Sequence, residues 1–143
     1  MCIRDSIWAN LLSDDARGRL VMWAGHDDAD LGNTNQVWAF DLQEGSWTVQ
    51  EEGDIWANNA NGYCDFPSDF TEPDLDAPER RYGGAAALSG SELIVFGGKT
   101  DCGQVNDLWT WDLESQIWAE RSSATFGEIC QRVFSGECDS LCF

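Results

Sequence analysis

The stretch VNDLWTWDLESQIW, residues 105–118, has a near copy in TNQVWAFDLQEGSW, residues 34–47. Asparagine, tryptophan, a second aromatic residue, aspartate, leucine and a final tryptophan recur in the same order, 71 residues apart. Short apolar runs precede both copies at an offset of 73, RLVMWAG at 19–25 and ELIVFGG at 92–98. Because such self-similarity marks proteins built from one repeated supersecondary unit, the pattern predicts two equivalent structural units.

Each unit is predicted to be a meander of four antiparallel strands. β-Branched and aromatic residues fill short runs that are bounded by Gly, Asp and Ser, and no segment sustains the helical period of 3.6. In the first unit the expected strands are residues 7–12, 19–24, 36–41 and 46–50. In the second unit they are residues 84–88, 92–97, 107–111 and 117–120. A repeat of four strands is the blade of a β-propeller, so the predicted fold class is all-β.

The geometry of a blade gives these residues structural roles. Gly97 and Gly98 are expected to end the second strand of their unit, where a side chain would obstruct the neighbouring backbone. Asp41 and Asp112 lie where a third strand enters its turn, and each is expected to fix that turn through an Asx hydrogen bond. The final tryptophan of each unit is expected to pack back on the third strand and to bury about 150–250 Å².

The combination of these residues resembles the Kelch repeat. In addition, PERRYGG at residues 78–84 resembles the family's P-x-x-R lead into the innermost strand, although the histidine usual a few positions later is absent. The first unit departs from the pattern, with Ala24 in place of the first glycine and Gln36 in place of an aspartate. The positions of the repeat motif are Gly25, Trp38, Asp41, Trp47, Gly97, Gly98, Asn106, Trp109, Asp112 and Trp118.

The resemblance implies a partial β-propeller of two four-stranded antiparallel Kelch blades. Propellers close with about four to eight blades, so we expect a fragment of a larger exported protein whose remaining blades complete the ring. MCIRDS, at the start, matches the translation of a sequencing-library adapter and is expected to be non-native. The expected organisation is 1–6 adapter-derived, 7–50 blade 1, 51–79 an acidic inter-blade insertion with aromatic residues, 80–121 blade 2, and 122–143 a Cys-rich start of a further blade or extension.

The charge balance is strongly acidic, with 26 Asp and Glu against eight Lys and Arg and a formal net charge of −18. Such a chain repels phosphate backbones and anionic lipid, which argues against nucleic-acid binding and membrane-surface roles. The longest apolar runs have the length of strands, so we expect no membrane insertion. The simplest explanation of the acidity is surface solubility, and attraction of basic partners is the alternative.

Five cysteines lie beyond the adapter-like residues, which is typical of an exported protein, extracellular or periplasmic, whose signal peptide we expect outside this segment. No C-x-x-C occurs and His26 is the sole histidine, so disulfides are favoured over a zinc site. A bond between Cys64 and Cys102 would tether the insertion to a blade. Cys130 and Cys138 form the expected local pair, although the sequence leaves the connectivity open.

The insertion 51–79 contains nine acidic residues, no basic residue and all three prolines. We expect it on the propeller face that also carries the loops 25–35 and 98–106. Its aromatic residues favour a loop folded back on the propeller, with a ligand-facing surface as the alternative. The candidates for that surface are Trp56, Tyr63, Phe66 and Phe70.

A weak calcium motif occurs in DDADLGNTN at residues 27–35, where carboxylates alternate before a glycine. Oxygen ligands on a turning loop suit Ca²⁺, and the ligands here would be Asp27, Asp28 and Asp30. The bidentate acid of a calcium loop is missing, so a polar turn that satisfies its own backbone is the favoured interpretation. No other cofactor is expected.

Together these features predict a non-catalytic binding module whose partner is a protein or a carbohydrate, bound through loops on one propeller face. The Kelch resemblance also admits copper radical oxidases and sugar-converting enzymes, whose catalytic residues could lie in further blades. Tyr63, Tyr82 and His26 show no sign of converging on a catalytic centre, so we expect no enzyme. His26 is expected to be a loop residue. A calcium-stabilised structural repeat of a surface protein is the third alternative.

Overall fold

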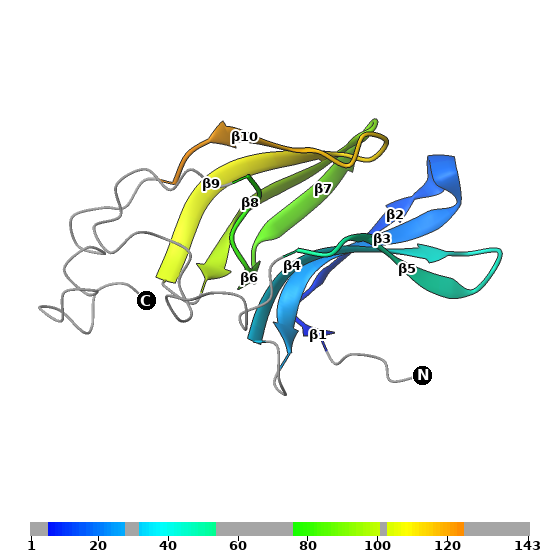
Figure 1. Cartoon of the computed structure of the whole chain (residues 1–143), viewed down its shortest axis with the longest axis horizontal. Coiled ribbons are helices and arrows are strands. Elements are labelled where there is room, and N and C mark those ends of the chain that lie inside the picture. Colours follow the sequence, from blue (N-terminus) through cyan, green and yellow to red (C-terminus); the bar gives the residue numbers. More distant parts are fainter. Residues whose placement is uncertain (1–5, 28–31, 54–75, 101–102, 125–143) are drawn as a thin grey trace, which may run out of the picture.

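The computed structural model describes residues 6–27, 32–53, 76–100 and 103–124 (Figure 1). Over these ranges the chain consists of antiparallel strands and one turn of 3-10 helix, Asp15–Arg17. None of the described residues belongs to a helix long and apolar enough to span a bilayer. The predicted all-β fold of four-stranded antiparallel blades is confirmed.

Blade 1 is a four-stranded meander. β2 and β4 pair with the two edges of β3, and β5 pairs with the free edge of β4. A two-residue strand, β1 (Ser6–Ile7), pairs with the end of β3. The four blade strands are β2 Asn10–Asp14, β3 Arg19–Asp27, β4 Gly32–Asp41 and β5 Ser46–Glu51.

Blade 2 repeats this arrangement. The two-residue strand β6 (Arg81–Tyr82) pairs with the end of β8, as β1 does with β3 in blade 1. β6 also pairs with Thr34 of β4, and this bridge joins the described strands of both blades into one hydrogen-bonded sheet. The four blade strands are β7 Ala85–Ser89, β8 Glu92–Thr100, β9 Gly103–Asp112 and β10 Trp118–Ser122.

The glycine pair of blade 2 does not end its strand, and that expectation was wrong. β8 continues to Thr100 through a β-bulge at the glycines, and β3 has the same bulge at residues 24–25. Gly97 has φ +59°, and a Cβ there would lie 3.0 Å from the carbonyl oxygen of Val105. Glycine therefore allows the strand to bend and approach its neighbour closely while pairing continues.

The innermost strand of blade 1 also differs from the expected residues 7–12. It is β2, Asn10–Asp14, whereas Ile7 belongs to the separate strand β1. Trp8 interrupts the two strands with a φ of +57°. The largely apolar stretch 7–12 gives no sign of this break, so one strand was predicted where the structure has the end of β1 and the start of β2.

The two blades pack face to face and bury one hydrophobic core between them (Figure 1). The ring centroids of Trp23 in blade 1 and Trp118 in blade 2 lie 6.2 Å apart, and Trp118 also lies 6.2 Å from Trp111. Each such ring removes about 150–250 Å² from water, so the tryptophans dominate this interface. The buried cluster consists of Val21, Trp23, Ala24, Val37, Leu93, Val95, Trp109, Trp111, Leu113 and Trp118.

An aspartate fixes the turn between the third and fourth strands of each blade. Asp41 Oδ1 accepts hydrogen bonds from the backbone N–H groups two and three residues on, both at 2.8 Å. Asp112 Oδ1 does the same at 3.0 and 2.7 Å, and it also accepts the Ser115 hydroxyl at 2.9 Å. These bonds, led by the backbone N–H of Ser115, hold the pKa of Asp112 below its ordinary value.

A buried ion pair anchors β6 to blade 2. Arg81 Nη1 and Nη2 bind the two carboxylate oxygens of Asp107, with Nη2 to Oδ2 at 2.8 Å, and both side chains are buried. Arg81 also donates to the backbone oxygens of Glu79 and Gly97, at 2.7 and 3.3 Å. Trp109 Nε1 completes the network with a 2.9 Å bond to Asp107 Oδ2. The pair is bidentate and hydrogen-bonded, as a buried pair must be to offset its desolvation.

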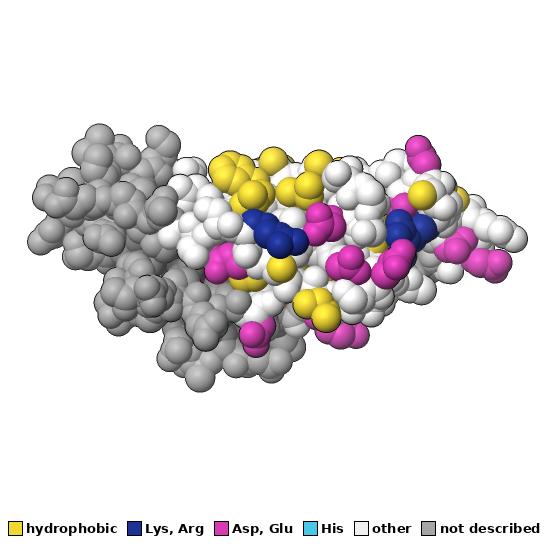
Figure 2. All heavy atoms as spheres, turned by 90° about the horizontal axis from the view of Figure 1, so that it is seen from above, with side chains coloured by type: hydrophobic (Ala, Val, Ile, Leu, Met, Phe, Trp, Pro, Cys, Tyr) yellow, Lys and Arg dark blue, Asp and Glu magenta, His cyan; other side chains and the backbone are white. Residues whose placement is uncertain are grey.

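Two further ion pairs lie at the surface. Arg17 of blade 1 contacts Glu114 of blade 2 at 3.1 Å, and Arg121 contacts Glu92 at 2.9 Å. On the face drawn in Figure 2, basic side chains lie beside acidic ones, and hydrophobic side chains are exposed between them. Solvent screens such pairs, so each contributes about 0–1 kcal/mol.

Replacing Asp107 with Asn should destabilise the fold by about 3–5 kcal/mol, because Arg81 would keep a buried charge without its counter-ion. Urea unfolding of the intact chain measures this loss. The matched control is Glu92→Gln, which removes the exposed partner of Arg121 and should cost less than about 1 kcal/mol. Equal costs for the two variants would contradict the buried network.

NMR titration of the Asp112 carboxyl group should give a pKa below that of an ordinary aspartate. A depressed folded-state pKa contributes stability above the unfolded-state pKa, and this contribution is lost as the pH falls through the folded-state value. Ser115→Ala removes the hydroxyl donor and should raise the pKa of Asp112 toward its ordinary value. An ordinary pKa in the unaltered chain would contradict the turn geometry.

Candidate functional site

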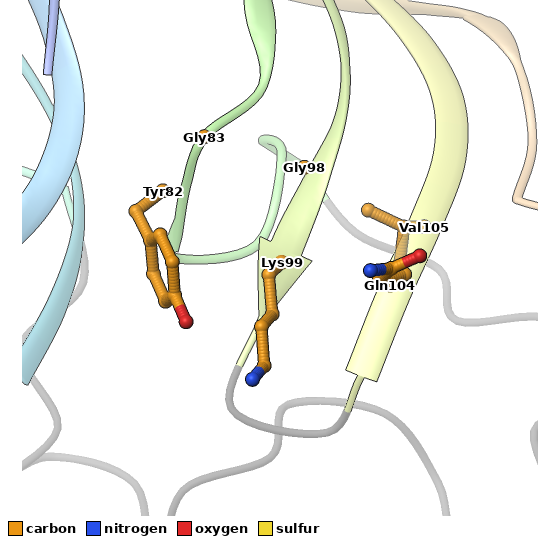
Figure 3. A pocket seen from close by; sticks show the side chains of 6 residues that line it. All are labelled: Tyr82, Gly83, Gly98, Lys99, Gln104 and Val105. Atoms are coloured by element: carbon orange, nitrogen blue, oxygen red, sulfur yellow. The ribbon is translucent and has the colours of Figure 1, made fainter. Parts of the chain in front are cut away.

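A pocket of about 370 Å³ opens near the end of β8 and the start of β9 (Figure 3). It lies toward the edge where Thr100 of β8 pairs with Gly103 of β9. Its volume falls in the range of small-molecule sites, about 300–1,000 Å³. The lining residues are Tyr82, Gly83, Gly98, Lys99, Gln104 and Val105.

The strand β6 brings Tyr82 to this pocket. Arg81 is held in the interior by Asp107, and side chains alternate along a strand, so the next residue projects to the opposite side. Gly98 permits the close approach, because a Cβ there would lie 3.0 Å from the carbonyl oxygen of Tyr82. In Figure 3 the Tyr82 hydroxyl and the Lys99 side chain extend toward the same side of the pocket. The buried ion pair thus positions the aromatic wall of the site.

Two aromatic rings of the first unit lie against Tyr82 of the second. Trp8 stacks on it with ring centroids 5.0 Å apart and an interplanar angle of 22°, and Trp8 itself is largely exposed. The His26 ring lies 5.6 Å away at 59°. His26 Nδ1 lies 2.7 Å from Asn33 Oδ1, which orients the imidazole. The result is a rigid aromatic wall that leaves part of the indole accessible to solvent.

Lys99 gives the pocket a positive charge in a chain of net charge −18, and it is the only lysine of the sequence. Its Nζ lies 6.0 Å from the centre of the Tyr82 ring, at the limit of a cation–π contact. Within the described ranges the ammonium group makes no ion pair with a carboxylate, whereas Arg17, Arg19 and Arg81 all do. Lys99 therefore remains available to a ligand.

Most of the residues predicted from the sequence to form sites lie outside the described ranges. This holds for the ligand-surface candidates Trp56, Tyr63, Phe66 and Phe70, for the cysteines Cys64, Cys102, Cys130 and Cys138, and for Asp28 and Asp30. Asp27 is the last residue of β3, and its side chain is not described. Among the described residues no three His, Cys, Asp or Glu side chains gather as a metal site would require.

The sequence also assigned His26 wrongly to a loop. The bulged β3 continues through it to Asp27, and this continuation carries the imidazole to Tyr82. The sequence did not predict the group of residues at the pocket, because three strands and the β1–β2 junction contribute them. These residues are Tyr82, Lys99, Gln104 and Trp8. The one signal available was Lys99, a single lysine directly after a motif glycine.

Two stacked four-stranded meanders, each with an aspartate-fixed turn and a tryptophan on its last strand, define a protein of β-propeller blades. Residues 80–124, which include blade 2, match the family model described as the Kelch motif. Blade 2 is therefore a Kelch repeat. No curated protein matches it.

Proposed function

We propose that the protein is a non-catalytic recognition module that binds a carbohydrate or a protein segment in the Tyr82 pocket. The observation that carries this proposal is the joint presence, in one open pocket, of an aromatic wall and the sole lysine of an acidic chain. Kelch repeats generally mediate protein interactions, which supports binding as the class of function.

The lining suits recognition by contact and hydrogen bonding. The faces of Tyr82 and Trp8 offer apolar area to a sugar ring or an aromatic side chain, and few rotamers have to be frozen. Lys99 and Gln104 supply donors and an acceptor at the same opening, which fixes the orientation of a polar ligand. Binding through surface contact and hydrogen bonds is sufficient to account for this lining, and no covalent step has to be invoked.

The acidic surface and the cysteines support an exported recognition protein, extracellular or periplasmic. A net charge of −18 attracts cationic partners at long range, and Lys99 adds a local contact for a polar or anionic group. The five cysteines beyond residues 1–6 are more numerous than a reduced cytosolic protein of this size usually needs.

NMR titration of the intact ¹⁵N-labelled chain should locate the ligand class. The probes are N-acetylglucosamine oligomers, glucuronate, and short acidic or basic peptides. A bound probe should shift the indole N–H signal of Trp8, and Tyr82→Ala should weaken its binding at least about tenfold, since one stacked ring contributes roughly 1–3 kcal/mol.

Lys99→Gln provides a second variant that removes an exposed charge without disturbing the core. It should weaken anionic probes most, while the control Ile117→Ala, at an exposed site in the β9–β10 connection, should leave all affinities unchanged. Binding that survives both pocket variants, or the absence of any shift with every probe, would contradict a ligand site here.

A further inference from the structure

Three strands place Tyr82, Lys99 and Gln104 in one row, called the pocket row. Tyr82 of β6 pairs with Lys99 of β8, and Lys99 pairs with Gln104 of β9. Residues that lie opposite one another in paired strands project on the same side of the sheet, so the three side chains are neighbours (Figure 3). Lys99 and Gln104 are exposed, and neither makes a hydrogen bond or an ion pair with any residue that the structure describes. The polar end of the row is therefore accessible to a ligand.

Blade 1 has a corresponding row, but its polar groups contact each other. Ile7 of β1 pairs with His26 of β3, which pairs with Asn33 of β4. His26 Nδ1 and Asn33 Oδ1 lie 2.7 Å apart, so the imidazole and the amide form a hydrogen bond. Lys99 stands at the position that His26 has in blade 1. The combination of an exposed cation and an exposed amide is thus specific to the pocket row.

Trp8 occupies a position where blade 2 has a glycine. The strands β1 and β2 correspond to β6 and β7 at an offset of 75 residues, and this offset aligns Trp8 with Gly83. Both residues have a left-handed backbone, with φ +57° at Trp8 and +67° at Gly83. That conformation suits glycine and is unfavourable for a residue with a bulky side chain. Tryptophan is therefore a strained choice at this turn.

The packing of Trp8 does not account for this strain. The indole is 62% exposed, and its stacking on the Tyr82 ring is a single contact at the surface. The free energy of such a contact is of the same order as the cost of the left-handed conformation, so stacking alone gives tryptophan no advantage over glycine. Strained residues cluster at ligand-binding sites, and Trp8 lies beside a residue that lines a pocket.

We propose that the pocket binds an acidic oligosaccharide in which a sugar that carries a carboxylate is linked to a neutral sugar. This inference rests on the recognition function proposed above and specifies its ligand. The carboxylate pairs with Lys99, a hydroxyl group of the acidic sugar exchanges hydrogen bonds with Gln104, and the neutral sugar packs its C–H groups on the exposed indole of Trp8.

The spacing of these groups favours two linked sugars. The strand β6 lies between the strands of blade 1 and β8, so Tyr82 stands between the indole and the ammonium group. The Tyr82 ring centre lies 5.0 Å from that of Trp8 and 6.0 Å from Lys99 Nζ. A ligand that contacts both Trp8 and Lys99 must therefore extend past the tyrosine ring, which a single sugar ring does not do.

The charge and polarity of the pocket select among anionic ligands. A densely charged polymer is repelled by a chain of net charge −18, whereas an isolated carboxylate can pair with the sole lysine. A peptide with an aromatic side chain is a poorer fit, because an apolar ring over the pocket row would desolvate Lys99 and Gln104 without giving them hydrogen-bond partners. A sugar supplies hydroxyl groups for these donors.

Titration of the intact chain with two disaccharides, followed by NMR, tests the ligand class. The probes are cellobiuronic acid and cellobiose, which differ only in that the first has a carboxylate where the second has a hydroxymethyl group. The acid should bind at least about tenfold more tightly, because its carboxylate forms a charge-assisted hydrogen bond with Lys99. Lys99→Gln should abolish this preference, so that the variant binds the two disaccharides equally.

Trp8→Gly tests the role of the indole. The variant should weaken both disaccharides by about fivefold or more, because it removes the stacking surface. Its melting temperature should rise or stay within about 4 °C of that of the unaltered chain, because glycine relieves the left-handed backbone. Trp8→Ala should bind as weakly as Trp8→Gly but melt at a lower temperature, since alanine keeps the backbone cost.

Gln116→Gly is the matched control for the backbone. Gln116 is exposed in the β9–β10 connection, has φ +59° and aligns with Gly45 of blade 1, whose φ is +66°. The substitution relieves the same conformation far from the pocket. It should therefore affect the melting temperature as Trp8→Gly does on account of the backbone, while both affinities stay unchanged.

The outcomes separate this inference from the recognition function. Equal binding of the two disaccharides, or tighter binding of an acidic peptide, would overturn the acidic oligosaccharide, and recognition in the pocket would stand if Tyr82→Ala still weakened the bound probe. Full affinity in Trp8→Gly, or a melting temperature lowered by more than about 8 °C, would show that Trp8 is a structural residue. Absence of binding by every probe, peptides included, would overturn both proposals.

Discussion

The packing of one blade on the next is the interaction on which the other features depend. A four-stranded sheet with apolar residues on both faces cannot remain in water alone, so each face requires a neighbour. Between the blades this requirement is met by Trp23 on one side and by Trp109, Trp111 and Trp118 on the other. The aspartate-fixed turns and the glycine bulges serve this packing, because they hold the long strands β3, β4, β8 and β9 in register at both ends.

A buried polar network links the core to the pocket. Arg81 is bound to Asp107 and to the backbone of Gly97, and these contacts hold β6 beside β8. The strand β6 therefore places Tyr82 in the lining of the pocket, together with Lys99. Blade 1 has Gln36 at the position of Asp107, and Trp38 Nε1 donates to Gln36 at 3.2 Å as Trp109 does to Asp107. The tryptophan contact is thus common to both blades, and the charge is specific to blade 2.

The sequence predicted the blades because their residues repeat with the periodicity of strands. Matching residues at a constant spacing indicate two equivalent units, as Trp38 does with Trp109 and Asp41 with Asp112. Periodicity could not tell which face of a blade packs inward, because both faces are apolar. Nor could it reveal β1 and β6, whose two residues each are too few for a pattern.

The pocket was beyond prediction for a related reason. Tyr82, Lys99 and Gln104 come from three strands, and Trp8 joins them only because the chain turns between β1 and β2. These residues are brought together by tertiary packing, so no regular spacing along the sequence predicts that they lie close to one another. The assignment of His26 to a loop failed similarly, since a glycine that usually ends a strand here forms a bulge within it.

Nuclear Overhauser contacts between the indole rings of Trp23 and Trp118 test the central claim, the face-to-face packing of the two blades, most directly. With their centroids 6.2 Å apart, the account predicts clear cross-peaks between the two rings in the dilute, monomeric chain. Cross-peaks from Trp118 to Trp111 alone, with none to Trp23, would show two blades that fold separately, and would contradict the shared core.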